Sequence, residues 1–217
     1  MNVGQFPTTT SPAALLRLFL RRRPVRITLL VLCLAGLSAG AYAGIRSALK
    51  HTPVFHEHFA VVDPGQLLRS SQPEPEDLDA VLREHGVRTI VILRSTPRSL
   101  LGQTWWDRER QWAQARGVHI VHLPCDADSP PTPDQIDAFF ALFEDAQRLP
   151  VLLHCEAGRH RTGVYAALYG IDRLGWTLEQ AREDMDRHGF NSQQSKRQKL
   201  MQVVERFAAA KAERLPR

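Results

Sequence analysis

Short apolar runs rich in β-branched residues alternate with longer helical patterns through most of this chain. Thr89–Leu93 and Val151–His154 have the length and composition of buried strands, and Val118–Leu123 is expected to be a further strand. Helical patterns separate them, and glycine ends two of these patterns, at Gly86 and Gly117. This alternation predicts an α/β fold in which helices flank a central, mostly parallel sheet.

The helical patterns can be placed along the chain from their periodicity and their capping residues. Two extended segments, 55–62 and 66–69, come first. Helices are then expected from Pro73-Glu74-Pro75-Glu76 to about His85, in a tryptophan-rich segment that ends at Gly117, and at about 133–149, 162–174, 177–188 and 195–212. Thr132 can act as the N-cap of the third of these helices, with glutamine at its third position, and Thr177 and Gln180 fit a capping box at the start of the fifth.

The basic charge of the chain is concentrated at its N-terminus. The chain has 28 Lys and Arg against 23 Asp and Glu, but residues 1–50 hold seven of the basic residues and no acidic one. The rest of the chain therefore carries 21 basic and 23 acidic residues. Because nucleic-acid-binding domains usually present an excess of basic residues on the folded part, we expect no nucleic-acid partner.

Residues 27–45 form an uncharged run of 19 residues, which is just long enough to cross a hydrocarbon core of about 30 Å as a helix. Five arginines precede this run, and only Arg46 and Lys50 closely follow it, so the positive-inside rule keeps the N-terminus in the cytoplasm. The alternative is a signal peptide cleaved near Ala43, because Ala41-Tyr42-Ala43 fits the small-residue cleavage pattern. We expect an uncleaved anchor. Both interpretations place the body of the protein outside the cytoplasm, on the periplasmic side in a bacterium.

These features predict four parts. Residues 1–26 are basic and partly disordered, residues 27–45 are the membrane anchor or signal segment, residues 46–53 are a linker, and residues 54–212 are the folded domain.

The run Val151–His154 leads directly into a loop, Cys155 to Arg161, that has Gly158 near its middle and a helix expected to follow from about Thr162. Ligands of open α/β sheets bind beyond the carboxyl ends of the strands. A short glycine-containing loop can turn successive N–H groups inward as an anion-binding nest, and the N-terminus of the next helix adds its dipole. The sequence therefore predicts a phosphate site formed by Glu156, Ala157, Gly158, Arg159, His160 and Arg161.

Cys155 lies at the base of this predicted site. The nest, the helix N-terminus and Arg161 all favour a thiolate, which is a good nucleophile toward phosphorus and would form a phosphocysteine. Arg161 has the planar guanidinium needed to hold two phosphoryl oxygens. Thr162 can donate a hydrogen bond to the sulfur when it leaves, and His154 is expected to support the loop by hydrogen bonding.

The segment His154–Gly163 resembles the active-site loop of the protein tyrosine phosphatase superfamily, His-Cys-x5-Arg-[Ser/Thr]. Leu68-Arg69-Ser70-Ser71-Gln72-Pro73 and the pattern at Gly86–Arg94 are similar to the compact dual-specificity branch, and to its exported bacterial members in particular. The resemblance covers about residues 55–205. It implies a central mixed sheet, hydrolysis of phosphomonoesters, and neither a metal nor another cofactor. The partner would be a phosphorylated protein, carrying phosphotyrosine alone or phosphoserine and phosphothreonine as well, or another phosphomonoester.

The leaving oxygen needs a proton, and one carboxylic acid can supply it and later activate water. In the resembling family this acid is an aspartate about thirty residues before the cysteine. Asp126 and Asp128 lie 29 and 27 positions upstream of Cys155. We expect Asp128 to be the acid, with Asp126 as the alternative. Cys125, which precedes these residues, is a candidate for a regulatory disulfide with Cys155.

Two other functions fit parts of this pattern. A rhodanese-like sulfurtransferase also places a reactive cysteine in an anion-binding loop, but it needs neither Arg161 nor an upstream acid. A catalytically silent phosphate-binding module would be expected to lack the nucleophile or the acid.

Overall fold

The computed structural model describes residues 58–97 and 104–214. The chain divides into two units, Met1–Thr52 and Pro53–Arg217, and the described residues belong to the second. The predicted N-terminal segments at 1–26, 27–45 and 46–53 lie outside the described residues. Among the residues described, none of the helices is long and apolar enough to cross a bilayer.

Five short strands form one sheet with the order β1-β2-β5-β3-β4. The strands are β1 (Ala60–Asp63), β2 (Leu67–Ser70), β3 (Thr89–Ile92), β4 (His119–His122) and β5 (Val151–His154). All neighbouring pairs are parallel except β1 and β2, which form an antiparallel hairpin at one edge. The sheet is therefore mixed but mostly parallel, as predicted.

The central strand β5 delivers the cysteine loop. It lies between β2 and β3, and its last residue, His154, is in register with both Ser70 and Ile92. All four residues of each of β2, β3 and β5 are buried. Because these three strands are parallel, the segments that follow them meet at one edge of the sheet. That edge holds the cysteine loop.

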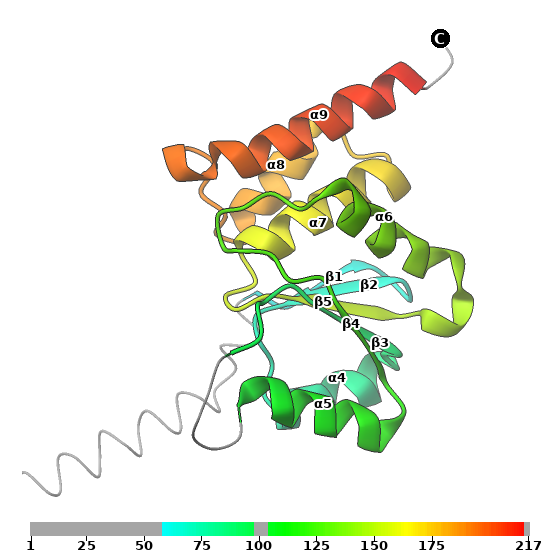
Figure 1. The fold of residues 1–217 in the computed structure, drawn as a ribbon. Coiled ribbons are helices and arrows are strands. Elements are labelled where there is room, and N and C mark those ends of the chain that lie inside the picture. The colour runs from blue at the N-terminus through cyan, green and yellow to red at the C-terminus, as the bar shows by residue number, and fades with distance from the viewer. Residues whose placement is uncertain (1–57, 98–103, 215–217) are drawn as a thin grey trace, which may run out of the picture. The chain divides into compact units, whose positions relative to one another are not determined.

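Helices cover both faces of the sheet (Figure 1). One face is covered by α4 (Pro75–His85) and α5 (Trp105–Arg116), and the other by α6 (Pro133–Ala141) and α7 (His160–Arg173). The last two helices, α8 (Leu178–Arg187) and α9 (Gln198–Arg214), pack on the outer side of α7 around a separate apolar cluster that includes Leu168, Met185 and Leu200. The cysteine loop therefore connects the centre of the sheet to a helix that is buried between two layers.

The capping residues identified in the sequence bound the helices as predicted. Thr132 caps α6 and Thr177 caps α8, and each forms a reciprocal capping box with a glutamine three positions on. Gly86 ends α4 and Gly117 ends α5, both in the left-handed conformation that favours glycine.

Two helix boundaries differ from the prediction for physical reasons. The helix predicted at 133–149 stops at Ala141 and continues as two single-turn 3₁₀ helices, Leu142–Glu144 and Ala146–Arg148. Between them Asp145 is extended, and its side chain accepts a hydrogen bond from the Gln147 N–H, which starts a new turn. The helix predicted from Thr162 begins instead at His160, because the Arg159 carbonyl accepts the first helical hydrogen bond from Gly163. Arg161 consequently belongs to the first turn of α7.

Candidate active site

Cys155 directly follows β5 and is almost completely buried, with 2% of its surface exposed. It begins a loop of five residues, 155–159, that leads into α7. Three carbonyl groups of this loop are bonded to groups outside it. The Cys155 carbonyl accepts a hydrogen bond from His154 Nδ1 (3.1 Å), that of Glu156 from the Gln72 N–H (3.0 Å), and that of Gly158 from Arg69 Nη2 (3.0 Å).

These three bonds determine the direction of the loop's N–H groups. In a planar trans peptide the C=O and the following N–H point in opposite directions. The three bonded carbonyls therefore turn the N–H groups of Glu156, Ala157 and Arg159 away from their partners. The N–H of Gly158 is directed at the Cys155 sulfur. This arrangement is consistent with the predicted anion nest, and the Glu156 and Gly158 carbonyls are held by residues that lie far away in the sequence.

Gly158 is required by the geometry of this loop. Its φ angle is +68°, in the region that side chains other than glycine disfavour. A Cβ atom at this position would lie 2.7 Å from the Ser71 nitrogen and 2.8 Å from the carbonyl carbon and oxygen of Ser70. The loop therefore packs directly against the backbone that follows β2.

The surroundings of Cys155 favour its thiolate. Burial by itself would raise the pKa of this thiol, because a thiolate is poorly solvated inside the protein. Hydrogen bonds from the hydroxyl and N–H of Thr162, the charge of Arg161 and the Gly158 N–H outweigh burial and hold the pKa below that of a free thiol. The Thr162 hydroxyl is fully buried and bonds to no other group among the described residues, so the Cys155 sulfur is the group it serves.

A buried chain of polar groups supports the loop from the α5 side. His154 Nε2 lies 2.8 Å from Glu109 Oε1, and Gln72 Nε2 donates to Glu109 Oε2 (2.7 Å). Burial would lower the pKa of His154, but the Glu109 carboxylate, the Cys155 carbonyl and the Cys155 thiolate together raise it. Because a carbonyl and a carboxylate face its two ring nitrogens, the surroundings of His154 favour its charged form, which would place a positive charge next to the nucleophile.

Arg161 extends from the first turn of α7 toward the ends of the neighbouring strands. Its Nη1 donates to the carbonyls of Leu93 (3.2 Å) and Cys125 (3.1 Å). The other guanidinium donors, Nε and Nη2, make no hydrogen bond within the described residues and are available for phosphoryl oxygens. Nη1 therefore holds the Arg161 guanidinium in place, while Nε and Nη2 can bind a phosphoryl group.

The two candidate acids lie in different surroundings. Asp128 is about half exposed and forms an ion pair with Arg197, a buried residue just before α9. It also acts electrostatically on His160, at the start of α7. Asp126 lies in the turn closed by the Ser129 N–H and acts instead on Cys125. Of the two carboxylates, only Asp128 is thus connected to the loop side of α7.

The remaining loop side chains form the rim of the site. Arg159 Nε donates to His58 Nε2 (3.1 Å). Glu156 is exposed and lies 3.6 Å from Arg94, whose guanidinium stacks over the Trp105 ring at 4.3 Å. Trp105 is thus half-buried against the α4–α5 side of the sheet and also contributes to the rim.

Cys125 and Cys155 are both buried free thiols that belong to the same apolar cluster. Burial raises the pKa of Cys125 to about 11, and Arg161 offsets only part of this effect. A disulfide between the two cysteines stays a prediction.

Four residues that the structure brings to the site had no predicted role from the sequence. They are Arg69, Gln72, Glu109 and Arg197. Only Arg69 and Gln72 carried a signal, since both lie in the segment that resembles the dual-specificity branch. No three His, Cys, Asp or Glu side chains gather as a metal-binding group within residues 58–97 and 104–214.

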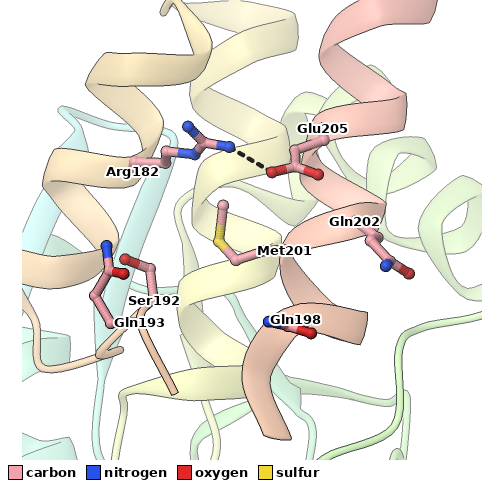
Figure 2. A pocket seen from close by; sticks show the side chains of 7 residues that line it. All are labelled: Arg182, Ser192, Gln193, Gln198, Met201, Gln202 and Glu205. Carbon is pink, nitrogen blue, oxygen red and sulfur yellow. Dashed lines mark hydrogen bonds and ion pairs between the residues drawn. The ribbon is translucent and has the colours of Figure 1, made fainter. Parts of the chain in front are cut away.

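A polar pocket of about 380 Å³ lies elsewhere, between α8 and α9 (Figure 2). Its lining consists of Arg182, Ser192, Gln193, Gln198, Met201, Gln202 and Glu205. None of these residues belongs to the cysteine loop or to the groups that support it.

Comparison with known proteins agrees with this geometry. The model of a family described as "DSP-PTPase phosphatase fused to NAD+ Kinase" matches residues 58–204. The chain belongs to this dual-specificity phosphatase family. It is accordingly a cysteine-dependent phosphatase, and the expectation drawn from the sequence motif is confirmed. The sulfurtransferase and the silent binding module that the sequence left open are not supported.

Several relatives of known identity are similar to this member of the dual-specificity phosphatase family. The dual specificity protein phosphatase TpbA of Pseudomonas aeruginosa (strain UCBPP-PA14) is 28% identical over 181 residues, which cover 80% of this chain and 76% of the relative. The crystal structure of P. aeruginosa TpbA has a TM-score of 0.52 at 26% identity and covers 75% of this chain and 99% of that one. The inositol diphosphatase DSP4 of Arabidopsis thaliana is 25% identical over 154 residues, 68% of this chain and 72% of the relative.

Proposed function

We propose that this phosphatase hydrolyses phosphotyrosine in proteins, and also phosphoserine and phosphothreonine, through a phosphocysteine formed on Cys155. The observation that carries the proposal is the loop in which three carbonyls are bonded to groups outside it, so that the following N–H groups face away from those partners, beside a buried thiol of lowered pKa. TpbA supports the choice of substrate, because it is named a dual specificity protein phosphatase and has been solved in complex with pTyr.

In the first step, the Cys155 thiolate attacks phosphorus while the bond to the leaving oxygen breaks. The loop N–H groups and the free side of the Arg161 guanidinium hold the three equatorial oxygens, where negative charge is retained in the transition state. A carboxylic acid gives its proton to the leaving oxygen, so that an alcohol or phenol departs. The enzyme then carries a phosphocysteine and a carboxylate.

In the second step, this carboxylate takes a proton from water as the water oxygen attacks phosphorus. The phosphorus–sulfur bond breaks, and the electron pair returns to the sulfur. The buried Thr162 hydroxyl and the Gly158 N–H stabilise the returning thiolate. Inorganic phosphate is released, and the carboxylic acid is restored.

We assign the acid role to Asp128, because it is connected to the loop side of α7 through Arg197 and His160. The test compares Asp128→Ala with Asp126→Ala on two substrates. Phenyl phosphate has a poor leaving group, phenol, and p-nitrophenyl phosphate has a good one, p-nitrophenol. Asp128→Ala should lose about 10²–10⁴-fold in kcat on phenyl phosphate and clearly less on p-nitrophenyl phosphate. A larger loss on phenyl phosphate in Asp126→Ala would transfer the role to Asp126.

The main experiment measures phosphate release from phosphotyrosine, phosphoserine and phosphothreonine peptides by the wild type and by Cys155→Ser, with a chelator present. We expect turnover of phosphotyrosine peptide first and no turnover by Cys155→Ser. Activity that survives Cys155→Ser, or that requires added metal, would contradict the mechanism. Trapping of phosphate on the protein after acid quench identifies the phosphocysteine in the wild type.

A second candidate substrate is a small molecule that carries several phosphates. Burial and then the charge of Arg197, with contributions from Arg159 and Lys196, lower the pKa of His160 to about 4, so three cationic groups lie within electrostatic range of His160. Such cationic groups suit a substrate with several phosphates, and one relative of this chain is named an inositol diphosphatase. We rank it second because Glu156 and Asp128 are exposed carboxylates near the same rim. Preference for a diphosphoinositol over every phosphopeptide would reverse this order.

We also propose that residues 27–45 anchor the protein in a membrane, with the phosphatase domain outside the cytoplasm. The support is the uncharged length of this run and the five arginines that precede it. The experiment expresses the full chain in a bacterium with a C-terminal alkaline phosphatase, which is active only outside the cytoplasm. An active fusion that resists carbonate extraction is the expected result. An inactive fusion contradicts the orientation, and a mature N-terminus after Ala43 would instead indicate a cleaved signal peptide.

A further inference from the structure

Arg69 is the largest of the fully buried side chains. It belongs to β2, in register with Leu153 of the central strand, and its exposed fraction is 0%. Its guanidinium makes two hydrogen bonds in different directions. Nη1 donates to Asp184 Oδ2 on α8 (2.7 Å), and Nη2 donates to the Gly158 carbonyl in the middle of the cysteine loop (3.0 Å).

This arrangement is a poor way to obtain stability. Burial lowers the pKa of Arg69 although Asp184 and Cys155 favour the charged form, and its Nε has no hydrogen-bond partner among the described residues. A buried ion pair often contributes no more to stability than a pair of apolar residues of the same size. The position of the guanidinium, between α8 and the loop, therefore needs an explanation other than stability.

The bond to Gly158 supplies that explanation. Because the Gly158 carbonyl is directed at Arg69, the N–H of the same peptide, that of Arg159, is turned the opposite way and joins the anion nest. The Gly158 carbonyl has no other bond partner in the described part of the chain. Without Arg69 this peptide would be free to rotate, and one donor of the nest would lose its direction.

Asp184 holds Arg69 in place and is itself held. His188 Nδ1 lies 3.4 Å from Asp184 Oδ1, and Arg187 lies 3.9 Å from the same oxygen. The Asp184 side chain is 12% exposed, and its carboxylate pKa is lowered because its hydrogen bond to His188 and the charge of Arg69 outweigh burial. Helix α8 is thus connected to the cysteine loop through two buried charged side chains.

We propose that Arg69, held by Asp184, is a positioning residue that orients the Gly158–Arg159 peptide for phosphate binding. It does not touch the substrate and acts through the loop. Since Arg69 also lies within electrostatic range of Cys155, its charge assists the thiolate. The inference rests on the proposed function, because it assigns the loop to a phosphoryl group.

The test separates position from stability with a double variant. Arg69→Met/Asp184→Leu removes both charges, leaves no unpaired buried ion and should unfold within a few degrees of the wild type. Two quantities are measured: the dissociation constant of tungstate by calorimetry, and kcat/KM on p-nitrophenyl phosphate. We expect tungstate to bind at least tenfold more weakly and kcat/KM to fall about 10²-fold, as when one oxyanion donor is lost.

The control removes another ion pair of α8 that has no contact with the loop. Arg182 of α8 pairs with Glu205 of α9 beside the polar pocket, and both side chains are partly exposed (Figure 2). Arg182→Met/Glu205→Leu should leave both measured quantities within twofold of the wild type. Equal losses in the two double variants would show that any weakening of α8 lowers activity, which would overturn the proposal.

A conservative variant keeps the test valid if the first double variant does not fold. Arg69→Lys retains the positive charge but not the planar fork that reaches both partners. It should keep most of the thiolate character of Cys155, measured as the pH dependence of alkylation by iodoacetamide, and still lose tungstate affinity. Wild-type tungstate affinity in folded Arg69→Lys, or in the folded double variant, overturns the proposal. If the wild type shows no cysteine-dependent turnover, the proposed function is refuted. If the Arg69 variants still bind tungstate more weakly than that wild type, the role of Arg69 in orienting the loop stands.

Discussion

The methyl group of an alanine at position 158 would have no space. Its Cβ would lie 2.7 Å from the Ser71 nitrogen and 2.8 Å from two backbone atoms of Ser70, none of which can rotate away. Since carbon contacts are optimal at about 3.5 Å, the loop and the segment after β2 must separate by about 0.8 Å. Misplacement on the order of 1 Å at a reacting centre costs about 10²-fold in rate. We therefore expect Gly158→Ala to lower kcat/KM about 10²-fold.

Gly175→Ala is the matched control for this variant. Gly175 has a φ of +69°, against +68° for Gly158, but a Cβ there would meet no atom within 4 Å. Both variants carry the same left-handed backbone strain of about 1–2 kcal/mol. Only Gly158→Ala adds the collision, which should cost a further 1–3 kcal/mol or so in the free energy of unfolding.

The assay compares kcat/KM on p-nitrophenyl phosphate with the free energy of unfolding in urea for both variants. Gly175→Ala should be destabilised by strain alone and keep its activity. The reasoning is refuted if Gly158→Ala has wild-type kcat/KM and loses no more stability than Gly175→Ala, because the loop would then have moved at no cost.

Three further predictions follow from the buried polar groups. Thr162→Val removes the hydroxyl that contributes most to lowering the pKa of Cys155, so inactivation by iodoacetamide should shift to higher pH; an unchanged pH profile would contradict this role. In the wild type the pKa of His154 is raised by Glu109, so this pair stabilises the fold below the ordinary histidine pKa of about 6.5 and loses that effect as pH rises through the raised value. Melting temperatures from pH 5 to 9 should therefore show a gap between wild type and Glu109→Gln that narrows at high pH, and a gap that widens would refute the sign. Tyr169→Phe removes a 2.6 Å hydrogen bond to Asp63 far from the loop and should cost about 1.5–3 kcal/mol in urea unfolding while kcat stays unchanged.

The strand–loop–helix unit around Cys155 follows from the sequence alone. An apolar run of four residues, a glycine in the loop and the positions of Cys155, Arg161 and Thr162 are all local in the chain, and local spacing is enough to predict an anion site after a buried strand. The helix caps at Thr132 and Thr177 could be predicted from the sequence for the same reason, since a capping box spans only four residues.

The groups that hold this unit in shape become apparent in the folded protein and not in the sequence. Arg69 reaches Asp184 across 115 positions, His154 reaches Glu109 across 45, and Arg197 reaches Asp128 across 69. No periodicity connects such pairs, because each depends on how β2, α5, α8 and α9 pack around the sheet. The sequence thus identifies the nucleophile, while the fold selects the buried charges that orient the loop around it.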